Sequence, residues 1–269
     1  MAHYYTRDGE TAYTVPYADG RPGKDTTIAD ARKLGLVPSV TEVMKVQDKP
    51  GLNHWFSNRM ALYGAKNAEL LPGMEEYKWL GMVRDQANEK TDEAIDIGTA
   101  LHDIVEAVVN NSPLPDIDFP VGDPEVFFDS FCEWWGKTGF RVVCTELPFA
   151  HPMGFGGRID LCALDKSDKD VIVDWKSRDT AGKKIQRLVF EDSNPIQLAA
   201  YLEGFRHHCF REYGGYVHMP RLANVIISRD EPGRVEMYEW DFTEYGRYWD
   251  WFKGLFEVWK CKNRYDPAF

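Results

Sequence analysis

The middle of the chain alternates between apolar and polar residues with the period of β-strands. Short polar or glycine-rich junctions separate the first three runs, which is typical of strands joined by hairpins. Two more strands are predicted later in the chain, between two segments with helical periodicity. The predicted strands cover residues 140–149, 156–164, 170–177, 216–228 and 234–240, and the two helices cover 193–213 and 243–262.

The first half of the chain has helical rather than strand-like spacing. Ser39 and Glu42 have the spacing of a capping box and predict a short helix that ends near Asp48. Residues 1–35 are polar and rich in turn residues, and we expect an irregular or weakly paired entry segment there. The longer predicted helices cover residues 53–65, 74–88, 91–111 and 124–138, and the third has an apolar stripe of Ile97, Leu101, Ile104, Val105 and Val108.

This order of elements predicts an α/β or α+β core that is preceded by a helical elaboration. We expect the elaboration at residues 1–90 and the core at 91–269, as one compact unit.

Composition limits the possible functions. The net charge is -11, whereas nucleic-acid-binding proteins are usually basic, although phosphate contacts depend on local clusters. The five cysteines form no CxxC pair, so we expect free thiols and neither a zinc site nor an iron–sulfur cluster. No apolar run reaches membrane-spanning length and no secretory segment is recognisable, so a cytoplasmic location is expected.

Candidate chemistry lies on the strand at 170–177. Asp174 and Lys176 are two residues apart and therefore share one face of a strand that is otherwise apolar. Pairing with the preceding strand can bring Asp160 beside Asp174, and two such carboxylates repel unless a cation lies between them. Magnesium is commonly bound by one or two carboxylates, and Lys176 could orient a water or stabilise charge on a phosphate. A purely structural ion pair between Asp174 and Lys176 is the alternative.

Asp160 followed by Asp174-Trp175-Lys176 resembles the motif of the PD-(D/E)XK nuclease superfamily. Gly98-Thr-Ala-Leu-His102 and Gln197-Leu-Ala-Ala-Tyr201 resemble the GxxxH and QxxxY motifs of RecB-like exonucleases, in the same order and spacing. The resemblance covers about residues 95–205. It implies an α/β fold with a restriction-endonuclease-like core, in which helices flank a central mixed sheet. Since the cysteines do not have the cluster-binding spacing, it implies the phage-type subgroup without an iron–sulfur cluster, similar to the mitochondrial genome maintenance exonuclease.

The resemblance implies a deoxyribonuclease that uses Mg²⁺ or Mn²⁺ and degrades linear DNA, single- or double-stranded, from free ends. Its role would be in recombination, replication or repair, possible partners would be recombination or replication proteins, and a phage-encoded enzyme would act in the bacterial host cytoplasm. The implied metal ligands are His102, Asp160, Asp174 and the main-chain carbonyl of Trp175, with Glu146 as a further candidate. Gln197 and Tyr201 would lie near the site, and Glu106 could orient His102.

Two groups of residues could contact DNA. Arg178, Lys183, Lys184 and Arg187 lie between the strand at 170–177 and the helix at 193–213, where a loop would overhang the site. Trp55 and Arg59 combine aromatic and basic character, as in single-strand binders. A solvated charged face is the alternative for these cations. A structure-selective endonuclease and a non-catalytic DNA-binding module remain alternative functions.

Overall fold

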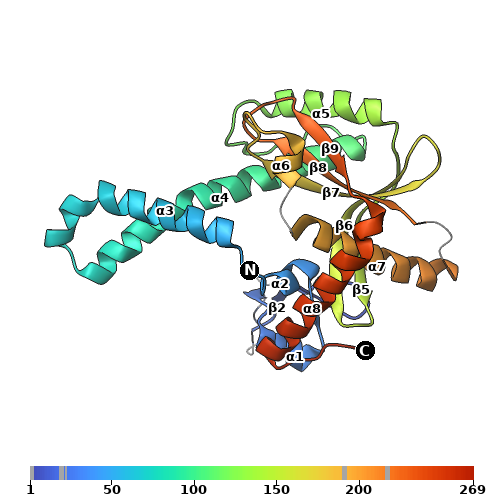
Figure 1. Cartoon of the computed structure of the whole chain (residues 1–269), viewed down its shortest axis with the longest axis horizontal. Coiled ribbons are helices and arrows are strands. Elements are labelled where there is room, and N and C mark those ends of the chain that lie inside the picture. Colours follow the sequence, from blue (N-terminus) through green and yellow to red (C-terminus); the bar gives the residue numbers. More distant parts are fainter. Residues whose placement is uncertain (1–2, 18–20, 22, 190–192, 216–218) are drawn as a thin grey trace.

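The centre of the computed structural model is a five-stranded mixed sheet with helices on both faces (Figure 1). The structure describes residues 3–17, 21, 23–189, 193–215 and 219–269. The strand order is β5-β6-β7-β8-β9, antiparallel throughout except for the parallel pair β7 and β8. The strands are β5 (Arg141–His151), β6 (Phe155–Leu164), β7 (Asp170–Arg178), β8 (Arg221–Ser228) and β9 (Val235–Glu239).

Each face of the sheet has its own apolar core. Ile172 points to the face covered by α7 (Ser193–Tyr213) and α8 (Tyr245–Asn263), where Leu198 and Leu202 of α7 are fully buried. Its neighbour Val173 points to the opposite face, which α4 (Glu76–Val109) and α5 (Pro124–Thr138) cover. Burial on both faces explains why β7 is apolar except at its few polar positions. The predicted fold class is therefore confirmed.

The parallel pair β7 and β8 needs a crossover connection, and α7 provides it. A five-residue helix, α6 (Ile185–Val189), precedes α7 in a segment predicted to be a loop. The predicted limits of α5 and α7 are confirmed. β8 begins at Arg221, and residues 216–218 of the strand predicted there lie outside the described residues. The short helix η2 (Phe242–Glu244) leads into α8.

The N-terminal segment packs against the sheet core more regularly than predicted. Its strands form two small antiparallel pairs, and α2 contacts α7, α8 and β6. The helix α1 was not predicted, although Thr27 and Asp30 form a complete capping box at its start. Ser39 caps α2 by accepting a hydrogen bond from Glu42 N at 3.0 Å, but this helix ends at Met44 rather than near Asp48. The elements are β1 (Tyr4–Tyr5), β2 (Thr14–Val15), β3 (Lys24–Asp25), α1 (Ile28–Leu34), β4 (Val37–Pro38) and α2 (Val40–Met44).

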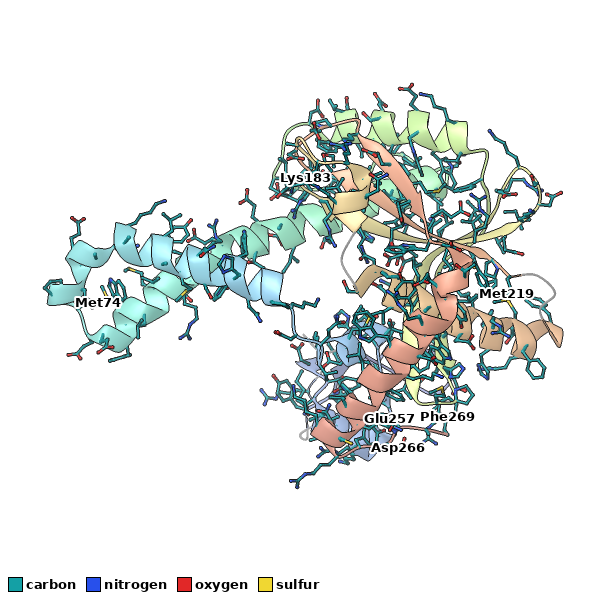
Figure 2. The ribbon with its side chains drawn as sticks, in the orientation of Figure 1. Met74, Lys183, Met219, Glu257, Asp266 and Phe269 are labelled. Atoms are coloured by element: carbon teal, nitrogen blue, oxygen red, sulfur yellow. The ribbon has the colours of Figure 1, made fainter. Side chains whose placement is uncertain are left out.

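A helical hairpin projects from the body, and we call it the arm (Figure 1). It consists of α3 (Pro50–Lys66), η1 (Ala68–Gly73) and the first half of α4, and Met74 marks its far end (Figure 2). The two helices predicted at 74–88 and 91–111 are wrong as separate elements, because α4 is one helix of 34 residues. No Gly or Pro lies between residues 82 and 97 to interrupt it. The expected domain boundary at residue 90 falls inside α4. Among the described residues, no helix is both long and apolar enough to cross a membrane.

Candidate active site

Asp174 on β7 is a buried carboxylate held by three side chains. It is 1% exposed. Its Oδ1 accepts hydrogen bonds from Lys176 Nζ at 2.9 Å and from Gln197 Nε2 at 3.0 Å. Its Oδ2 lies 2.7 Å from Lys176 Nζ and accepts a hydrogen bond from Asn224 Nδ2 at 2.7 Å. A charge withdrawn from water needs partners of this kind, so the environment is built for an ionised Asp174.

Asp160 on β6 lies next to this group. The β6–β7 pairing ends at Leu161 and Val173, and beyond it the N–H of Trp175 donates to Asp160 Oδ2 at 2.9 Å. Burial, and then the charge of Asp174, raise the pKa of Asp160 well above its usual value. The pairing expected from the sequence therefore does place the two carboxylates as interacting neighbours.

Gln197 and Tyr201 connect α7 to the same network. Gln197 Oε1 accepts from Lys176 Nζ at 3.2 Å, and Gln197 Nε2 donates to the hydroxyl of Tyr201 at 2.8 Å as well as to Asp174. The two residues are four apart and so occupy one side of the helix. The ring of Tyr201 packs edge-on against Phe149 on β5, with ring centroids 6.0 Å apart. The strand motif and the helix motif thus form one connected cluster.

His102 approaches this cluster from α4. The helix runs close to β7 one turn earlier, since a Cβ on Gly98 would lie 3.0 Å from Ser177 Oγ. Burial lowers the pKa of His102, while the charge of Asp174 and a hydrogen bond to the main chain of Trp175 act in the opposite direction. The main chain of Trp175 is therefore one partner of this histidine, and the orientation of His102 by Glu106, which is exposed in the same region, stays a prediction.

Lys176 and His102 line an open pocket of about 620 Å³. The residues of the cluster that are not part of its lining are Asp160, Asp174, Gln197 and Tyr201. The pocket lies between α4, the inner part of β5 and β6, and the C-terminal end of β7, and its lining is mostly polar. The side chains that could meet a substrate there include His102, Glu106, Glu146, Arg158, Lys176 and Arg178.

Glu146 on β5 reaches the pocket through an unusual backbone conformation. Its φ of 52° lies in the left-handed region, which costs free energy for a residue other than glycine and often marks a functional position. Its carboxylate forms an ion pair with Arg158 of β6. Burial raises the pKa of Glu146, and the nearby Glu106 adds to this while Arg158 opposes it. Glu146 is therefore near the predicted site but is bound to an arginine.

The donor atoms suit a hard cation only in part. Across the described residues, no group of three or more His, Cys, Asp or Glu side chains is arranged to hold a metal ion, so His102, Asp160 and Asp174 do not form a closed set of ligands. The neighbouring carboxylates of Asp160 and Asp174 do fit Mg²⁺ or Mn²⁺, because such ions often take one or two carboxylates and complete their shell with water and phosphate oxygens.

The predicted DNA-binding residues lie in two separate places. Arg178 lines the pocket, and Lys183 follows in a loop on the side of the body from which the arm projects (Figure 2). This loop is fastened by Thr180, whose N–H donates to Asp230 at 2.7 Å. Lys184 and Arg187 are exposed in the same segment.

Trp55 and Arg59 lie on the arm rather than in the pocket. The guanidinium of Arg59 stacks over the ring of Trp55 at 5.1 Å and over the ring of Tyr63 at 5.2 Å. Tyr63 was not predicted to take part.

Asn224 and Arg158 also belong to the site but were not predicted. Asn224 is 0% exposed in the otherwise apolar run Leu222–Ile227, and a lone amide in a buried strand was a usable signal because buried polar groups need partners. Arg158 shares a strand face with Asp160, a relation that the alternation of the strand already implied.

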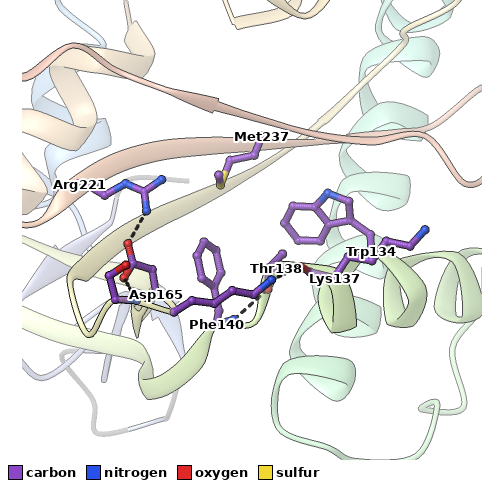
Figure 3. Close-up of a pocket in the computed structure, with 9 residues that line it drawn as sticks. Trp134, Lys137, Thr138, Phe140, Asp165, Arg221 and Met237 are labelled. Atoms are coloured by element: carbon purple, nitrogen blue, oxygen red, sulfur yellow. Dashed lines mark hydrogen bonds and ion pairs between the residues drawn. The ribbon is translucent and has the colours of Figure 1, made fainter.

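A second pocket of about 370 Å³ lies at the opposite end of β7 (Figure 3). Trp134, Phe140 and Met237 form its apolar part, and Arg221 at its edge pairs with Asp165 at 2.7 Å. None of the predicted site residues lines this pocket, so the chemistry is assigned to the larger one.

The comparison with protein families agrees with this geometry. A family model described as the PD-(D/E)XK nuclease superfamily matches residues 125–239, a range that includes Asp160, Asp174, Lys176, Gln197 and Tyr201. A solved structure described as the crystal structure of SSO0001 is 16% identical, with 78% of this chain and 77% of that chain covered and a TM-score of 0.27. The comparison with curated proteins found no match. Residues 125–239 therefore constitute a PD-(D/E)XK nuclease superfamily domain, built on the mixed sheet that carries the Asp174 cluster.

Proposed function

We propose that this protein is a metal-dependent DNA exonuclease of the RecB-like, phage type, which hydrolyses phosphodiester bonds from free DNA ends. The observation that supports it most is the position of the Lys176 ammonium. It contacts Asp174, is held by Gln197, and lies in the wall of an open polar pocket beside a second carboxylate, Asp160. Nucleases of the superfamily typically use divalent ions such as Mg²⁺.

Asp160 and Asp174 would hold Mg²⁺ or Mn²⁺, with His102, the Trp175 carbonyl and Glu146 as further donors. When bound, such an ion would polarise the phosphate and lower the pKa of a water from about 15.7 toward ~7. No iron–sulfur cluster is part of the proposal.

The protein's own groups would then position the reacting atoms. Lys176 would orient the attacking water or stabilise the charge that grows on the phosphate. Gln197 keeps the ammonium in place by accepting from it, and Tyr201 fixes the Gln197 amide by accepting from its nitrogen. Because burial lowers the pKa of His102, the imidazole stays neutral and keeps a nitrogen lone pair available as a donor.

The arm would make the enzyme selective for ends. It projects from the body along α4, the helix that carries His102 (Figure 1). In this proposal it is a steric barrier that a free strand can pass and a closed duplex cannot. Arg178, Lys183, Lys184 and Arg187 would contact phosphates near the pocket, and Trp55 and Arg59 would contact bases along the arm. In this proposal residues 1–90 serve as the elaboration and 91–269 as the nuclease core, acting in recombination, replication or repair, together with a protein partner from one of these processes, in the cytoplasm of a bacterial host.

The test compares three forms of one DNA: linear and end-labelled, nicked, and covalently closed. With Mg²⁺ or Mn²⁺ we expect release of label from the linear form and no cleavage of the closed circle. Neither Lys176→Met nor Asp174→Ala should cleave any form. Cleavage of the closed circle at a similar rate would make the protein an endonuclease. Stabilisation of the fold by metal without cleavage of any form would indicate a non-catalytic DNA-binding module.

A further inference from the structure

A buried amide lies behind the carboxylate that the proposed mechanism uses. Asn224 on β8 is directly opposite Asp174 in the parallel register of β7 and β8, and it is 0% exposed. Its Nδ2 donates to Asp174 Oδ2 at 2.7 Å. Lys176 lines the 620 Å³ pocket but neither Asp174 nor Asn224 does, so Asn224 would affect the chemistry through its contact with Asp174.

The orientation of this amide is determined by Trp240, just beyond the end of β9. The indole Nε1 of Trp240 donates to Asn224 Oδ1 at 2.8 Å. An indole N–H is a donor only, so it requires the amide oxygen on its side and turns the amide nitrogen toward Asp174. The reversed amide would place its oxygen against the carboxylate of Asp174 and its NH₂ group against the indole N–H of Trp240. Both buried hydrogen bonds would then be lost, because acceptor would face acceptor and donor would face donor.

The consequence is that two different elements hold Asp174. Gln197 from α7 donates to Oδ1, and Asn224 from β8 donates to Oδ2. Donors on both oxygens fix the plane of the carboxylate, and Lys176 contacts both oxygens of that same plane. The position of the ammonium therefore depends on the donor from β8 as well as on the donor from α7.

We propose that Asn224 is a positioning residue for the nuclease reaction, and that the Trp240 indole acts through it by setting the direction of its amide. The pair holds Asp174 in the orientation that its interaction with a divalent ion and with Lys176 requires. This inference rests on the proposed metal-dependent cleavage.

The test uses Trp240→Phe, which keeps Asn224 but removes the N–H, and Asn224→Leu, which removes the amide at similar volume. Leu222→Ala is the matched control, because it weakens the same strand on the face toward α7 without removing a hydrogen bond to Asp174. The measurements are kcat, KM for end-labelled DNA, the Mn²⁺ concentration for half-maximal rate, Mn²⁺ binding by calorimetry, and urea unfolding.

We expect both test variants to lower kcat or Mn²⁺ affinity by about 10- to 100-fold, the usual effect of losing a group that orients a metal ligand, while KM for DNA changes little. Leu222→Ala should lose stability but keep the kcat and the Mn²⁺ affinity of the wild type. The inference is overturned if Asn224→Leu and Trp240→Phe match the wild type, or if Leu222→Ala shows the same loss of Mn²⁺ affinity. A wild-type protein that neither cleaves DNA nor binds Mn²⁺ would instead refute the proposed function, and this inference with it.

Discussion

Replacing Lys176 with methionine tests the charge balance on which the site depends. The Lys176 ammonium lies 2.7 Å from Oδ2 and 2.9 Å from Oδ1 of Asp174, and the two side chains are 20% and 2% exposed. Removing one partner of a buried ion pair typically costs about 3–5 kcal/mol, because the other charge stays buried without compensation. Asn224 and Gln197 still donate to Asp174 in the variant, and the lysine is partly solvated. We therefore expect Lys176→Met to lower the free energy of unfolding by about 2–3 kcal/mol, at or just below the lower limit of that range.

The double variant Asp174→Asn with Lys176→Met separates stability from catalysis. In the double variant a neutral amide replaces the carboxylate of Asp174, so no unpaired charge is left in the core. The loss of unfolding free energy in the double variant should therefore be smaller than the sum of the two single losses by at least about 1 kcal/mol. Cleavage should be absent in both single variants and in the double variant, because each lacks a group that meets the phosphate, the water or the metal.

The assay is urea unfolding at pH 7 with EDTA, followed by cleavage of end-labelled linear DNA with Mg²⁺ or Mn²⁺. If Lys176→Met is as stable as the wild type, or if the two single losses simply add, Asp174 and Lys176 are not a buried, coupled pair. Wild-type cleavage by Lys176→Met would remove the lysine from the mechanism altogether.

Three other predictions concern packing, pH and salt. Gly204→Ala should lower the free energy of unfolding in urea by about 1–3 kcal/mol, since its Cβ would lie 2.2 Å from the ring of Phe149, and an unchanged stability would contradict that packing. Burial lowers the pKa of His151 to about 4 from 6.5, so the unfolded chain binds the extra proton first. The stability that this histidine contributes should be present above pH 6.5 and be lost as the pH falls toward 4, with a flatter profile in His151→Phe. The cleavage rate below saturating DNA should fall steeply with KCl, and Lys184→Ala should reduce the slope of the logarithmic plot by about 1 if that lysine contacts a phosphate.

The strands of the core could be predicted because their residues follow a local pattern that the sequence shows directly. In β7, Val171 and Val173 alternate with Ile172 and Asp174, and burial on both faces follows from that pattern. The helix α7 could be delimited because its apolar rows are long, with buried positions from Ile196 to Cys209. The continuity of α4 could not, because the polar run at residues 88–93 interrupts its apolar stripe between Ala87 and Ala94, and the half in the arm packs on α3 and η1 rather than on the sheet.

The site residues that the sequence did not reveal depend on how strands that are distant in sequence pair with one another. Asn224 meets Asp174 across 50 residues of sequence, and only the parallel pairing of β7 with β8 brings them together. The same holds for Trp240, whose role exists only because β9 returns beside β8. Glu146 shows a different limit. The family resemblance placed it near the site, but its left-handed backbone and its ion pair with Arg158 are local features of β5 that a regular strand period does not describe.

The acidity of the chain and a DNA substrate can be reconciled by where the charges lie. The chain has 43 Asp and Glu residues, yet none occurs in the 17 residues of α3, which carries Arg59 and Lys66. The segment from Lys176 to Arg187 likewise contains five cations and a single acid, Asp179. Because exposed charges are screened beyond about 10 Å in ordinary salt, a phosphate backbone responds to these two segments rather than to the net charge of -11. All but one of the acids lie outside these two segments, so the same distribution that lowers overall affinity would favour DNA binding at the arm and beside the pocket.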